Sequence, residues 1–463
     1  MRVGIVVDHP KRDLEGAVRI AYEVTKLGGE ALLIPMYTQG ADVPLLGLDT
    51  IVLNYARPTN RPLIETYARE GIKVLILDTE GGVLSETGAN SPKAHVERLK
   101  DGDFAKSIAG YFFWGDRLKD AFAAAGLFSE ATRRVTGCPR FDLAARKWRS
   151  LLRHHRSGYV LVNGNFSTVN PKYAGSVDAE RKTMVAVGWA PDYVDRLSAD
   201  LEWTFASFLQ SVAAVAKKLP GVPFLVRPHP FEREEPYGEA FSGLANVSID
   251  GSGSVFKVVG NATAVLHCNC GTAVEAVMLE KLPIHMKFLD TETTANHALL
   301  PAKVSYHATS VEDVVATLEN LAARTAEFPF EEIYAVHIYP YYYKHDGDAG
   351  NRVAEVLMRC RTRGEAPFKR SIKAALLSGR PKPTPPQLLN GMLNLIFGSA
   401  FTSELRCLLK PARRDKAFTL RDLGDYLDQL ASLDALETAE FDVCRAGNPF
   451  TVVPLSTVVV RKA

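Results

Sequence analysis

Short apolar runs alternate with longer amphipathic segments over the first 150 residues of the chain. The amphipathic segments, among them Asp13–Leu27 and Pro62–Glu70, carry apolar residues three and four positions apart, which is the helical period. Strands that alternate with helices in this way predict a parallel sheet with helices on its faces. The predicted strands are Val3–Val7, Ala31–Pro35, Thr50–Leu53, Lys73–Leu77 and Tyr111–Trp114.

The same pattern starts again near Ser157, after a basic amphipathic stretch over 141–158 that predicts a linker helix. The helical period returns over Ala199–Lys218 and Gly271–Glu280, and the predicted strands are Tyr159–Val162, Pro223–Arg227, Ala264–His267 and Ile284–Phe288. We therefore expect an α/β protein with two Rossmann-like, doubly wound domains, over 1–150 and 151–358, that face a cleft. Residues 359–463 fall outside both patterns and are expected to form a mainly helical appendage.

Polar residues stand immediately after several predicted strands. Asp8, Asn54 and Asp78 each follow an apolar run of the first half. In an open doubly wound sheet, the carboxyl ends of the strands line the crevice that binds ligands. These residues are therefore better candidates for a functional site than any residue of the apolar runs.

Two strand ends in the second half carry residues that suit an anion. Arg227 and His229 lie in a run with two prolines, which end the strand and stiffen the turn. The segment His267–Glu275 leads from a strand into a helix, where backbone N–H groups, Gly271 and the Thr272 hydroxyl predict a phosphate site. Alternatively, Gly271 and Thr272 only cap the helix, and His229 is a turn residue whose hydrogen bonds are satisfied.

The loop after the first strand of the second half is rich in side chains that form hydrogen bonds. Asn163, Asn165 and Thr168 lie in it. Such side chains commonly bond to nearby backbone, so a turn-rich connection explains them. Because the loop leaves the carboxyl end of a strand, a contact with a nucleotide or a phosphate explains them equally well.

Eight short blocks of the sequence, taken as a set, resemble one known family. They resemble the bacterial surface carbohydrate biosynthesis proteins, which are glycosyltransferases with the two-Rossmann GT-B fold. That family is more distantly similar to enzymes that transfer Kdo or sialic acid from CMP-sugars, and to capsule and teichoic-acid polymerases. The blocks occur in the family's order within residues 1–358 and read VDHPKRDLEG, LNYARPTN, LDTEGG, VTGCPRFDL, NGNFSTVNP, VRPHP, CGTAVEA and HDGDAGNRVAE.

The resemblance implies that a sugar is transferred from a nucleotide donor to a bacterial surface glycan or a lipid-linked acceptor. The donor that it suggests first is a CMP-linked 2-keto sugar acid such as Kdo, and no other cofactor is expected. Two alternatives remain open. One is a nucleotide-sugar 2-epimerase with the same fold, and the other is a non-catalytic scaffold of glycan assembly.

The same resemblance implies roles for residues of the second domain. His229 matches the His-Pro motif of the CMP-sugar transferases, so it is expected to hold the nucleotide phosphate with Arg227 beside it. The pair Gly271–Thr272 loosely matches a Ser/Thr motif at a helix start, and Asn269 lies in the same turn. Glu275, one turn inside that helix, is expected to bind a ribose hydroxyl.

The first domain is expected to supply the general base, as an acidic-Gly motif does in sialyltransferases of this fold. An acceptor hydroxyl loses a proton as it attacks the anomeric carbon, and a positioned carboxylate contributes roughly 10²–10⁴-fold in rate by accepting it. Glu80, flanked by glycines that let a sugar approach, is the first candidate. Asp8, Asp78 and Asp13 follow, although Asp13 also suits a helix cap. A retaining route would use one carboxylate as the nucleophile, and the sequence leaves both routes open.

No metal site is expected. Two acidic pairs on glycine turns, at 101–106 and 345–350, are interpreted as ordinary turns. We therefore expect a metal-independent mechanism, in which positive charges and a helix dipole offset the charge of the leaving phosphate.

The net charge of the chain is small, but one segment of it is strongly basic. The 463 residues include 55 Lys and Arg against 53 Asp and Glu, a net charge of +2, which excludes a uniformly basic nucleic-acid binder. Residues 359–416 nevertheless carry 13 basic and 3 acidic side chains, or +10, whereas 417–463 carry −3 and 1–358 carry −5. Within the basic part, the apolar run at 388–401 suits a helix on an anionic membrane surface, or else an appendage packed on the domains.

We expect the chain to act in the cytoplasm, either free or on the inner face of a membrane. Met1 and Arg2 lead directly into a predicted strand and then into charged residues, unlike a signal peptide. No apolar stretch reaches the length of about 20 residues that crosses a bilayer.

Overall fold

The computed structural model describes residues 1–82, 91–100, 103–152, 156–186, 188–360, 385–409, 416–434, 441–447 and 453–463. The chain divides into two compact units. The first contains Met1–Gly82, His95–Asp142 and Tyr342–Ala463, and the second contains Leu143–Tyr341 together with the short stretch that precedes His95. Among the described residues, the chain passes from one unit to the other within α4 (Pro92–Lys100), between Asp142 and Leu143, and within α16 (Tyr339–Tyr342).

The first unit is built on an eight-stranded sheet in the order β13-β14-β2-β1-β3-β4-β5-β6. Six strands are parallel, and the order reverses between β1 and β3, so the switch point of the sheet lies there. The five strands predicted for this half are confirmed as β1 to β5. The bounds are β1 (Arg2–Val7), β2 (Glu30–Pro35), β3 (Thr50–Leu53), β4 (Lys73–Leu77), β5 (Gly110–Phe113), β6 (Arg133–Val135), β13 (Phe441–Gly447) and β14 (Pro454–Lys462).

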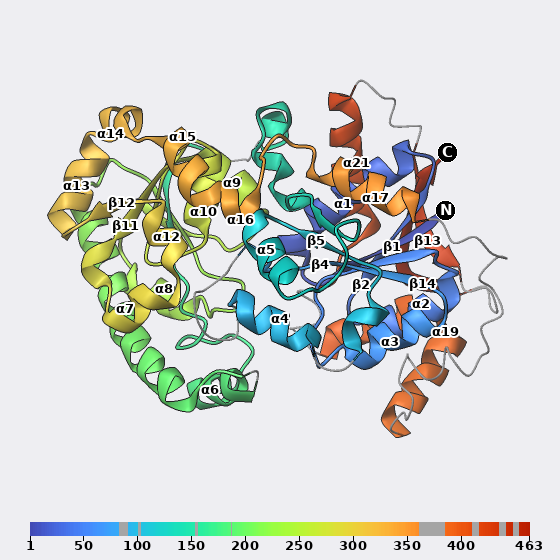
Figure 1. Ribbon diagram of the computed structural model, residues 1–463. Helices are drawn as coiled ribbons and strands as arrows, with labels where there is room; N and C mark the ends of the chain where they lie inside the picture. Colours follow the sequence, from blue (N-terminus) through green and yellow to red (C-terminus); the bar gives the residue numbers. More distant parts are fainter. Residues whose placement is uncertain are drawn as a thin grey trace. The chain divides into compact units, whose positions relative to one another are not determined.

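Helices cover this sheet, and α1 is the most deeply buried of them. It packs against β2, α17 and α21, and every residue from Glu15 to Thr25 is buried. The buried charge of Arg19 is paired with Glu23 on the same helix and with Asp142, 3.6 Å away. The helices of this unit are α1 (Glu15–Lys26), α2 (Gln39–Leu46), α3 (Arg61–Arg69), α5 (Asp116–Ala124), α17 (Ala349–Arg359), α19 (Pro385–Leu409) and α21 (Leu420–Leu433) (Figure 1).

The second unit contains a six-stranded, fully parallel sheet in the order β12-β11-β10-β7-β8-β9. This is the strand order of a dinucleotide-binding fold, and its switch point lies between β7 and β10. The four strands predicted for this half are confirmed as β7, β8, β10 and β11. The bounds are β7 (Tyr159–Asn163), β8 (Phe224–Arg227), β9 (Val247–Ile249), β10 (Ala262–His267), β11 (Leu282–Met286) and β12 (Tyr306–Ala308).

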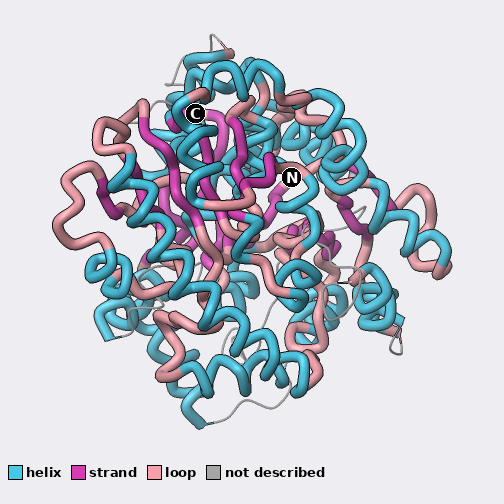
Figure 2. The backbone as a smooth tube through the Cα atoms, turned by 90° about the vertical axis from the view of Figure 1, so that its left-hand side faces the viewer, coloured by secondary structure: helices cyan, strands magenta, loops and turns pink. Residues whose placement is uncertain are grey.

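The longest described helix of this unit is α7, which contains the predicted helix Ala199–Lys218. Figure 2 distinguishes the helices and strands of the backbone by colour. The core between helices and sheet is apolar and includes Phe166, Phe208 and Phe224. The helices are α6 (Val177–Ala186), α7 (Pro191–Lys218), α8 (Glu235–Ala240), α9 (Val255–Asn261), α10 (Thr272–Met278), α11 (Glu292–His297), α12 (Leu299–Lys303), α13 (Val311–Glu319), α14 (Leu321–Glu327) and α15 (Phe330–Ile333).

The prediction of one linker helix over 141–158 is wrong in its described part. The segment instead forms two stretches of 3-10 helix, Pro139–Ala144 and Arg146–Leu152. The Asp142 carboxylate accepts hydrogen bonds from the backbone N–H groups of Ala349 (2.9 Å) and Gly350 (2.8 Å), at the start of α17. This tertiary contact holds the backbone in place, and a helical periodicity does not reveal it.

The C-terminal region is helical, as expected, and also contains two strands that we did not predict. The helices are α19 and α21, and β13 and β14 form an antiparallel hairpin that extends the first sheet. Val458 of β14 pairs with Leu33 of β2. The chain therefore ends inside the sheet in which it begins, and both termini are marked in Figure 1.

Candidate functional site

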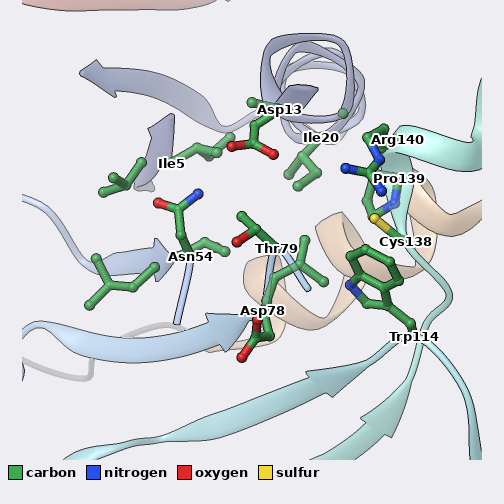
Figure 3. A pocket seen from close by; sticks show the side chains of 16 residues that line it. Ile5, Asp13, Ile20, Asn54, Asp78, Thr79, Trp114, Cys138, Pro139 and Arg140 are labelled. Carbon is green, nitrogen blue, oxygen red and sulfur yellow. The ribbon is translucent and has the colours of Figure 1, made fainter. Parts of the chain in front are cut away.

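Each sheet has a pocket at its switch point. The pocket of the first unit has an empty volume of about 450 Å³ and lies at the carboxyl ends of β1, β3, β4 and β5. Strand ends that diverge at a switch point leave this space between their loops. The lining residues are Ile5, Val6, Asp13, Gly16, Ala17, Ile20, Val52, Leu53, Asn54, Leu77, Asp78, Thr79, Trp114, Cys138, Pro139 and Arg140 (Figure 3).

Three polar side chains from separate segments point toward the middle of this pocket. They belong to Asp13, Asn54 and Thr79 (Figure 3). The Asp78 carboxylate points away from them in the same view. It accepts hydrogen bonds from the backbone N–H of Glu80 (2.9 Å) and from the Tyr111 hydroxyl (3.2 Å). Asp78 therefore holds the loop after β4 to the sheet and does not present its carboxylate to the pocket.

A cluster of ion pairs connects the other predicted carboxylates. Arg12 lies at its centre and pairs with Asp8 (2.8 Å), with Asp13 (2.8 Å) and, more distantly, with Glu80 (3.8 Å). Glu80 is also 3.1 Å from Arg57. We call Asp8, Arg12, Asp13, Arg57 and Glu80 the Arg12 cluster. It brings together three of the carboxylates predicted from the sequence.

Lys416, from the basic C-terminal region, joins the Arg12 cluster. Its Nζ lies 2.9 Å from Asp8 Oδ1, and both side chains are mostly buried. Burial alone would raise the pKa of Asp8, but the hydrogen bond from Lys416 and the charges of Lys416 and Arg12 outweigh it and lower the pKa. Asp8 is therefore held as a carboxylate, which makes it a weak proton acceptor.

The two glycines after Glu80 accommodate aromatic rings. A Cβ on Gly81 would lie 3.1 Å from the Trp114 ring, and a Cβ on Gly82 would lie 2.9 Å from the Tyr342 ring. Trp114 and Tyr342 contact each other, with ring centroids 5.5 Å apart. We expected these glycines to let a sugar approach the backbone. In the structure, the space above them is filled by side chains of the protein itself.

The pocket of the second unit lies at the switch point between β7 and β10. Its empty volume is about 620 Å³, and three of the predicted binding residues, Asn165, Thr168 and Asn269, line it. The other lining residues come from the same loops and from α7 and α11: Phe166, Ser167, Leu197, Leu201, Thr204, Cys268, Thr294 and His297. Sequence reasoning missed the α7 and α11 residues, because only the folding of the sheet brings these helices over the strand ends.

A buried polar network joins the two strand ends at this switch point. Asn163, which pairs with His267 across the sheet, donates a hydrogen bond from Nδ2 to the Thr272 hydroxyl (3.2 Å). The Thr272 hydroxyl is also 3.0 Å from the Cys270 thiol. Asn163 Oδ1 is buried without a hydrogen-bond partner among the described residues. Two of the predicted residues, Asn163 and Thr272, are thus in contact, as expected for neighbours at one sheet edge.

Asn269 has an unusual backbone conformation. Its φ angle is +50°, in the left-handed region, and its side chain donates a hydrogen bond to the Thr294 carbonyl. Asn269 Oδ1 is buried without a hydrogen-bond partner among the described residues. Asparagine adopts this region more readily than most residues, and non-glycine residues in it are frequent at binding sites.

The remaining predicted residues of this unit lie apart from the pocket lining. The Arg227 guanidinium donates hydrogen bonds to the carbonyls of Ser252 and Gly253, so it fixes the loop after β9. His229 Nδ1 accepts a hydrogen bond from the backbone N–H of Phe231 (3.3 Å). Gly271 and Glu275 belong to the start and the buried first turn of α10, a helix of only seven residues.

An aromatic cluster adjoins the pocket through His297. The rings of Trp189 and Tyr193 are stacked, with centroids 5.6 Å apart, and the Tyr193 hydroxyl lies 3.0 Å from His297 Nδ1. Burial lowers the pKa of His297. One side of the pocket is therefore bordered by a neutral imidazole and two large aromatic rings.

The described residues include no group of three or more His, Cys, Asp or Glu side chains that could hold a metal ion. In the same residues, no helix combines the length and the apolar character that are needed to cross a bilayer.

Comparisons with known proteins identify the fold. No protein-family model matches the sequence. No curated protein matches it either. Among solved structures, a variant of the wall teichoic acid polymerase TagF is 12% identical, with a TM-score of 0.51, over 78% of this chain and 88% of that one.

UDP-GlcNAc 2-epimerases are further structural neighbours at lower scores. The Neisseria meningitidis enzyme, solved with UDP-GlcNAc, is 12% identical with a TM-score of 0.47, over 78% of this chain and all of that one. The Methanocaldococcus jannaschii enzyme is 12% identical with a TM-score of 0.46 over the same shares. At such low identity the likeness concerns the fold. The likeness to TagF and the two sheets together confirm the expected pair of Rossmann-like units of the GT-B class, whereas the similarity to CMP-sugar transferases stays a prediction.

Proposed function

We propose that this protein is a nucleotide-sugar-dependent glycosyltransferase of glycan biosynthesis. The observation that carries the proposal is the second unit's pocket, which lies at the switch point of a sheet with the strand order of nucleotide-binding folds. The fold shared with a teichoic acid polymerase supports it. We also propose that the acceptor is a surface glycan or a lipid-linked molecule, and this part of the proposal rests only on the eight sequence blocks.

The donor is proposed to bind in the second unit's pocket. Asn165, Thr168 and Asn269 offer neutral hydrogen-bonding groups there, which suit the hydroxyl and carbonyl groups of a nucleoside and a sugar. Two positive side chains were expected to bind the phosphate. His229 keeps this proposed role, whereas Arg227 does not, because its guanidinium donates hydrogen bonds to the carbonyls of Ser252 and Gly253.

The donor that we propose first is a CMP-linked 2-keto sugar acid such as Kdo. Its support is the match of His229 and Pro230 to the His-Pro motif of enzymes that use CMP-sugars. A thermal-shift panel of CMP, CDP, UDP and their sugar derivatives tests the nucleotide directly.

The first unit is proposed to supply the general base, and Asp13 now replaces Glu80 as the first candidate. Asp13 lines the pocket and points into it, whereas Asp78 points away from it. Arg12 pairs with both Asp13 and Asp8, but Asp8 is also paired with Lys416 and does not line the pocket. Glu80 is the most exposed of these carboxylates but is paired with Arg57. A base at Asp13 would accept the proton of an acceptor hydroxyl bound beside Asn54 and Thr79.

Ligand-induced stabilisation tests the donor site. A nucleotide that binds the folded chain raises its stability by about 2.7 kcal/mol at a hundredfold excess over Kd, which shifts the melting temperature. Asn165→Ala removes one lining side chain that is exposed, so the fold is retained and the shift is lost. The matched control is Asn320→Ala, an exposed asparagine at the end of α13 that should keep the shift.

Three results distinguish the proposal from its alternatives. A donor that stabilises the chain and loses its sugar only when a glycan acceptor is added supports transfer. NMR that shows a nucleotide sugar converted to its 2-epimer without any acceptor would instead identify an epimerase. If none of the nucleotides shifts the melting temperature, the proposed enzyme is rejected and the scaffold alternative gains support.

A further inference from the structure

The helix α19 exposes an apolar face. Nearly half of all exposed large apolar side chains in the described residues belong to this one helix. These side chains are Leu389, Met392, Leu393, Ile396, Phe397, Phe401 and Leu405, and Ile396 is 57% exposed. A kink at Gly398, where φ is +79°, divides α19. The first five side chains recur three or four positions apart and therefore lie on one side of the part before the kink, and Phe401 and Leu405 are likewise four positions apart in the part after it.

Three polar side chains of α19 face the protein. Asn394, Ser399 and Thr402 are buried, and the Thr402 hydroxyl donates a hydrogen bond to Asn394 Oδ1. The Ser399 hydroxyl accepts a hydrogen bond from the Ser456 backbone N–H (2.8 Å), and the Ser399 carbonyl accepts one from the Ser456 hydroxyl (2.8 Å). α19 is thus attached to β14 by hydrogen bonds, and its apolar side is left outside.

This arrangement is the reverse of an ordinary surface helix, which buries its apolar face and exposes its polar one. A contiguous exposed apolar face of this kind marks a site of interaction with a protein or a membrane. In Figure 1 part of α19 extends away from the rest of its unit, next to α2.

Charge distinguishes the two classes of partner. Residues 359–416, which contain α19, carry 13 basic and 3 acidic side chains. Two copies of this chain that paired through α19 would bring two such segments together, and their like charges would repel. An anionic bilayer instead offers its apolar interior to the exposed side chains of α19 and negative headgroups to a segment of net positive charge.

We propose that the exposed apolar side chains of α19 dock this protein on an anionic phospholipid bilayer. The helix lies in the plane of the interface, with Ile396, Phe397 and Phe401 in the acyl region. This proposal does not depend on the proposed function, because it concerns a different surface and is measured without turnover.

Flotation of the full chain with vesicles tests the proposal. Vesicles of phosphatidylcholine with phosphatidylglycerol should carry the protein upward in a density gradient, and vesicles of phosphatidylcholine alone should carry much less. Raising the salt concentration should weaken the binding, because it screens the attraction between lysine, arginine and lipid headgroups.

A matched pair of variants locates the contact. Replacing Ile396, Phe397 and Phe401 by serine should weaken anionic-vesicle binding by about tenfold or more, because three apolar side chains no longer enter the membrane. Trp203→Ser combined with Val336→Ser removes side chains that are equally exposed, at 53% and 58%, outside α19. That control should bind vesicles like the wild type.

A second measurement does not require removal of apolar side chains. Phe397→Trp places a fluorophore on the exposed face of α19. Its emission should shift to shorter wavelength with anionic vesicles and be quenched by brominated acyl chains, relative to the wild-type signal.

Four results would overturn the proposal. The first is no flotation with anionic vesicles, and the second is equal flotation with neutral and anionic vesicles. The third is equal binding by the wild type and the triple serine variant. The fourth is a dimer in sedimentation velocity that the triple variant abolishes while no vesicle binding is seen, which would assign the face to a second copy of the chain.

Discussion

Arg12 pairs with three carboxylates of the first unit. It lies 2.8 Å from Asp8 and from Asp13, and 3.8 Å from Glu80. Because all three are paired with Arg12, their positions rather than this partner distinguish them. Asp13 combines a short contact to Arg12 with a place in the pocket lining.

We therefore predict that Asp13→Asn lowers kcat of sugar transfer by roughly 10²–10⁴-fold, because the proton acceptor is lost. Glu80→Gln should change kcat by less than about tenfold, since Glu80 mainly offsets the charges of Arg57 and Arg12. Both variants should keep the nucleotide-induced thermal shift, which serves as the control for folding. The opposite order of the two kcat values would transfer the role to Glu80.

Three histidines lie in register on neighbouring strands of the second sheet. His267 pairs with His285, and His285 pairs with His307. The rings of His267 and His285 are stacked, with centroids 5.3 Å apart. Burial, and then the neighbouring histidines, hold the pKa of His267 well below 6.5. His267 is therefore neutral in the folded chain at any pH near neutrality.

This histidine makes the stability of the fold depend on pH. Below about pH 6.5 the unfolded chain binds a proton at His267 and the folded chain does not, so the contribution of His267 is present above that pH and is lost as the pH falls. The loss amounts to at most about 1.4 kcal/mol per pH unit. We predict that the free energy of unfolding falls more steeply below this pH in the wild type than in His267→Asn.

The comparison with a variant is needed because buried acids act in the opposite direction. Burial raises the pKa of Asp42, Asp142 and Glu232 to about 6. Their contribution is fully present at low pH and is lost as the pH rises through about 6. Urea unfolding at several pH values isolates the effect of His267, with His337→Asn as a control at a histidine outside the three that lie in register. Equal pH slopes for wild type and His267→Asn would refute it.

At the scale of elements, the attachment of α19 depends on one glycine. Gly398 has a φ of +79° within the helix, and a Cβ there would collide with the Pro454 carbonyl at the start of β14. A residue other than glycine would be strained at this φ and would also separate the helix from the strand.

Gly398→Ala should therefore destabilise the first unit by about 1–3 kcal/mol. The matched control is Gly424→Ala on α21, where a Cβ meets no atom within 4 Å and alanine favours the helix. Thermal and urea unfolding measure both. A Gly398→Ala variant as stable as Gly424→Ala would show that α19 is not anchored in this way.

At the scale of the whole chain, a buried carboxyl group attaches the C-terminal strand to the N-terminal part of the first unit. Asp42 Oδ2 accepts hydrogen bonds from the Thr457 backbone N–H (3.1 Å) and from the Thr457 hydroxyl (2.8 Å). These residues are 415 positions apart in the sequence. When a buried polar group loses its hydrogen-bond partner, the fold is destabilised by more than the net contribution of that hydrogen bond, because the group stays out of contact with water.

We predict that Thr457→Val destabilises the chain by about 1–3 kcal/mol, because Asp42 loses one donor while the shape of the side chain is kept. Thr183→Val, which removes an exposed hydroxyl on α6, should change stability by less than about 0.5 kcal/mol. Urea unfolding of both variants gives the comparison. Equal stabilities would contradict the proposed attachment.

The sequence was sufficient for the two parallel sheets. All nine predicted strands are present, because each is a short apolar run between amphipathic segments, and buried parallel strands require that pattern. Three short parallel strands, β6, β9 and β12, were missed because each has only three residues, at least one of which is polar, so none of them forms an apolar run. The run Thr457–Val460 of β14 contains three consecutive valines, a pattern that favours a strand.

The sequence by itself also determined that polar residues gather at the carboxyl ends of strands, since this depends only on local order along the chain. It predicted Asn163, Asn165, Thr168 and Asn269 in one half and the carboxylates in the other. Which of these side chains share a pocket was decided by the tertiary structure, because strand order and the helices from distant segments set their spacing. Lys416 reaches Asp8 across 408 positions, and the inverted packing of α19 follows from its hydrogen bonds to β14. The local pattern of apolar and polar residues does not depend on contacts between residues so far apart, so only the folded chain could show these contacts.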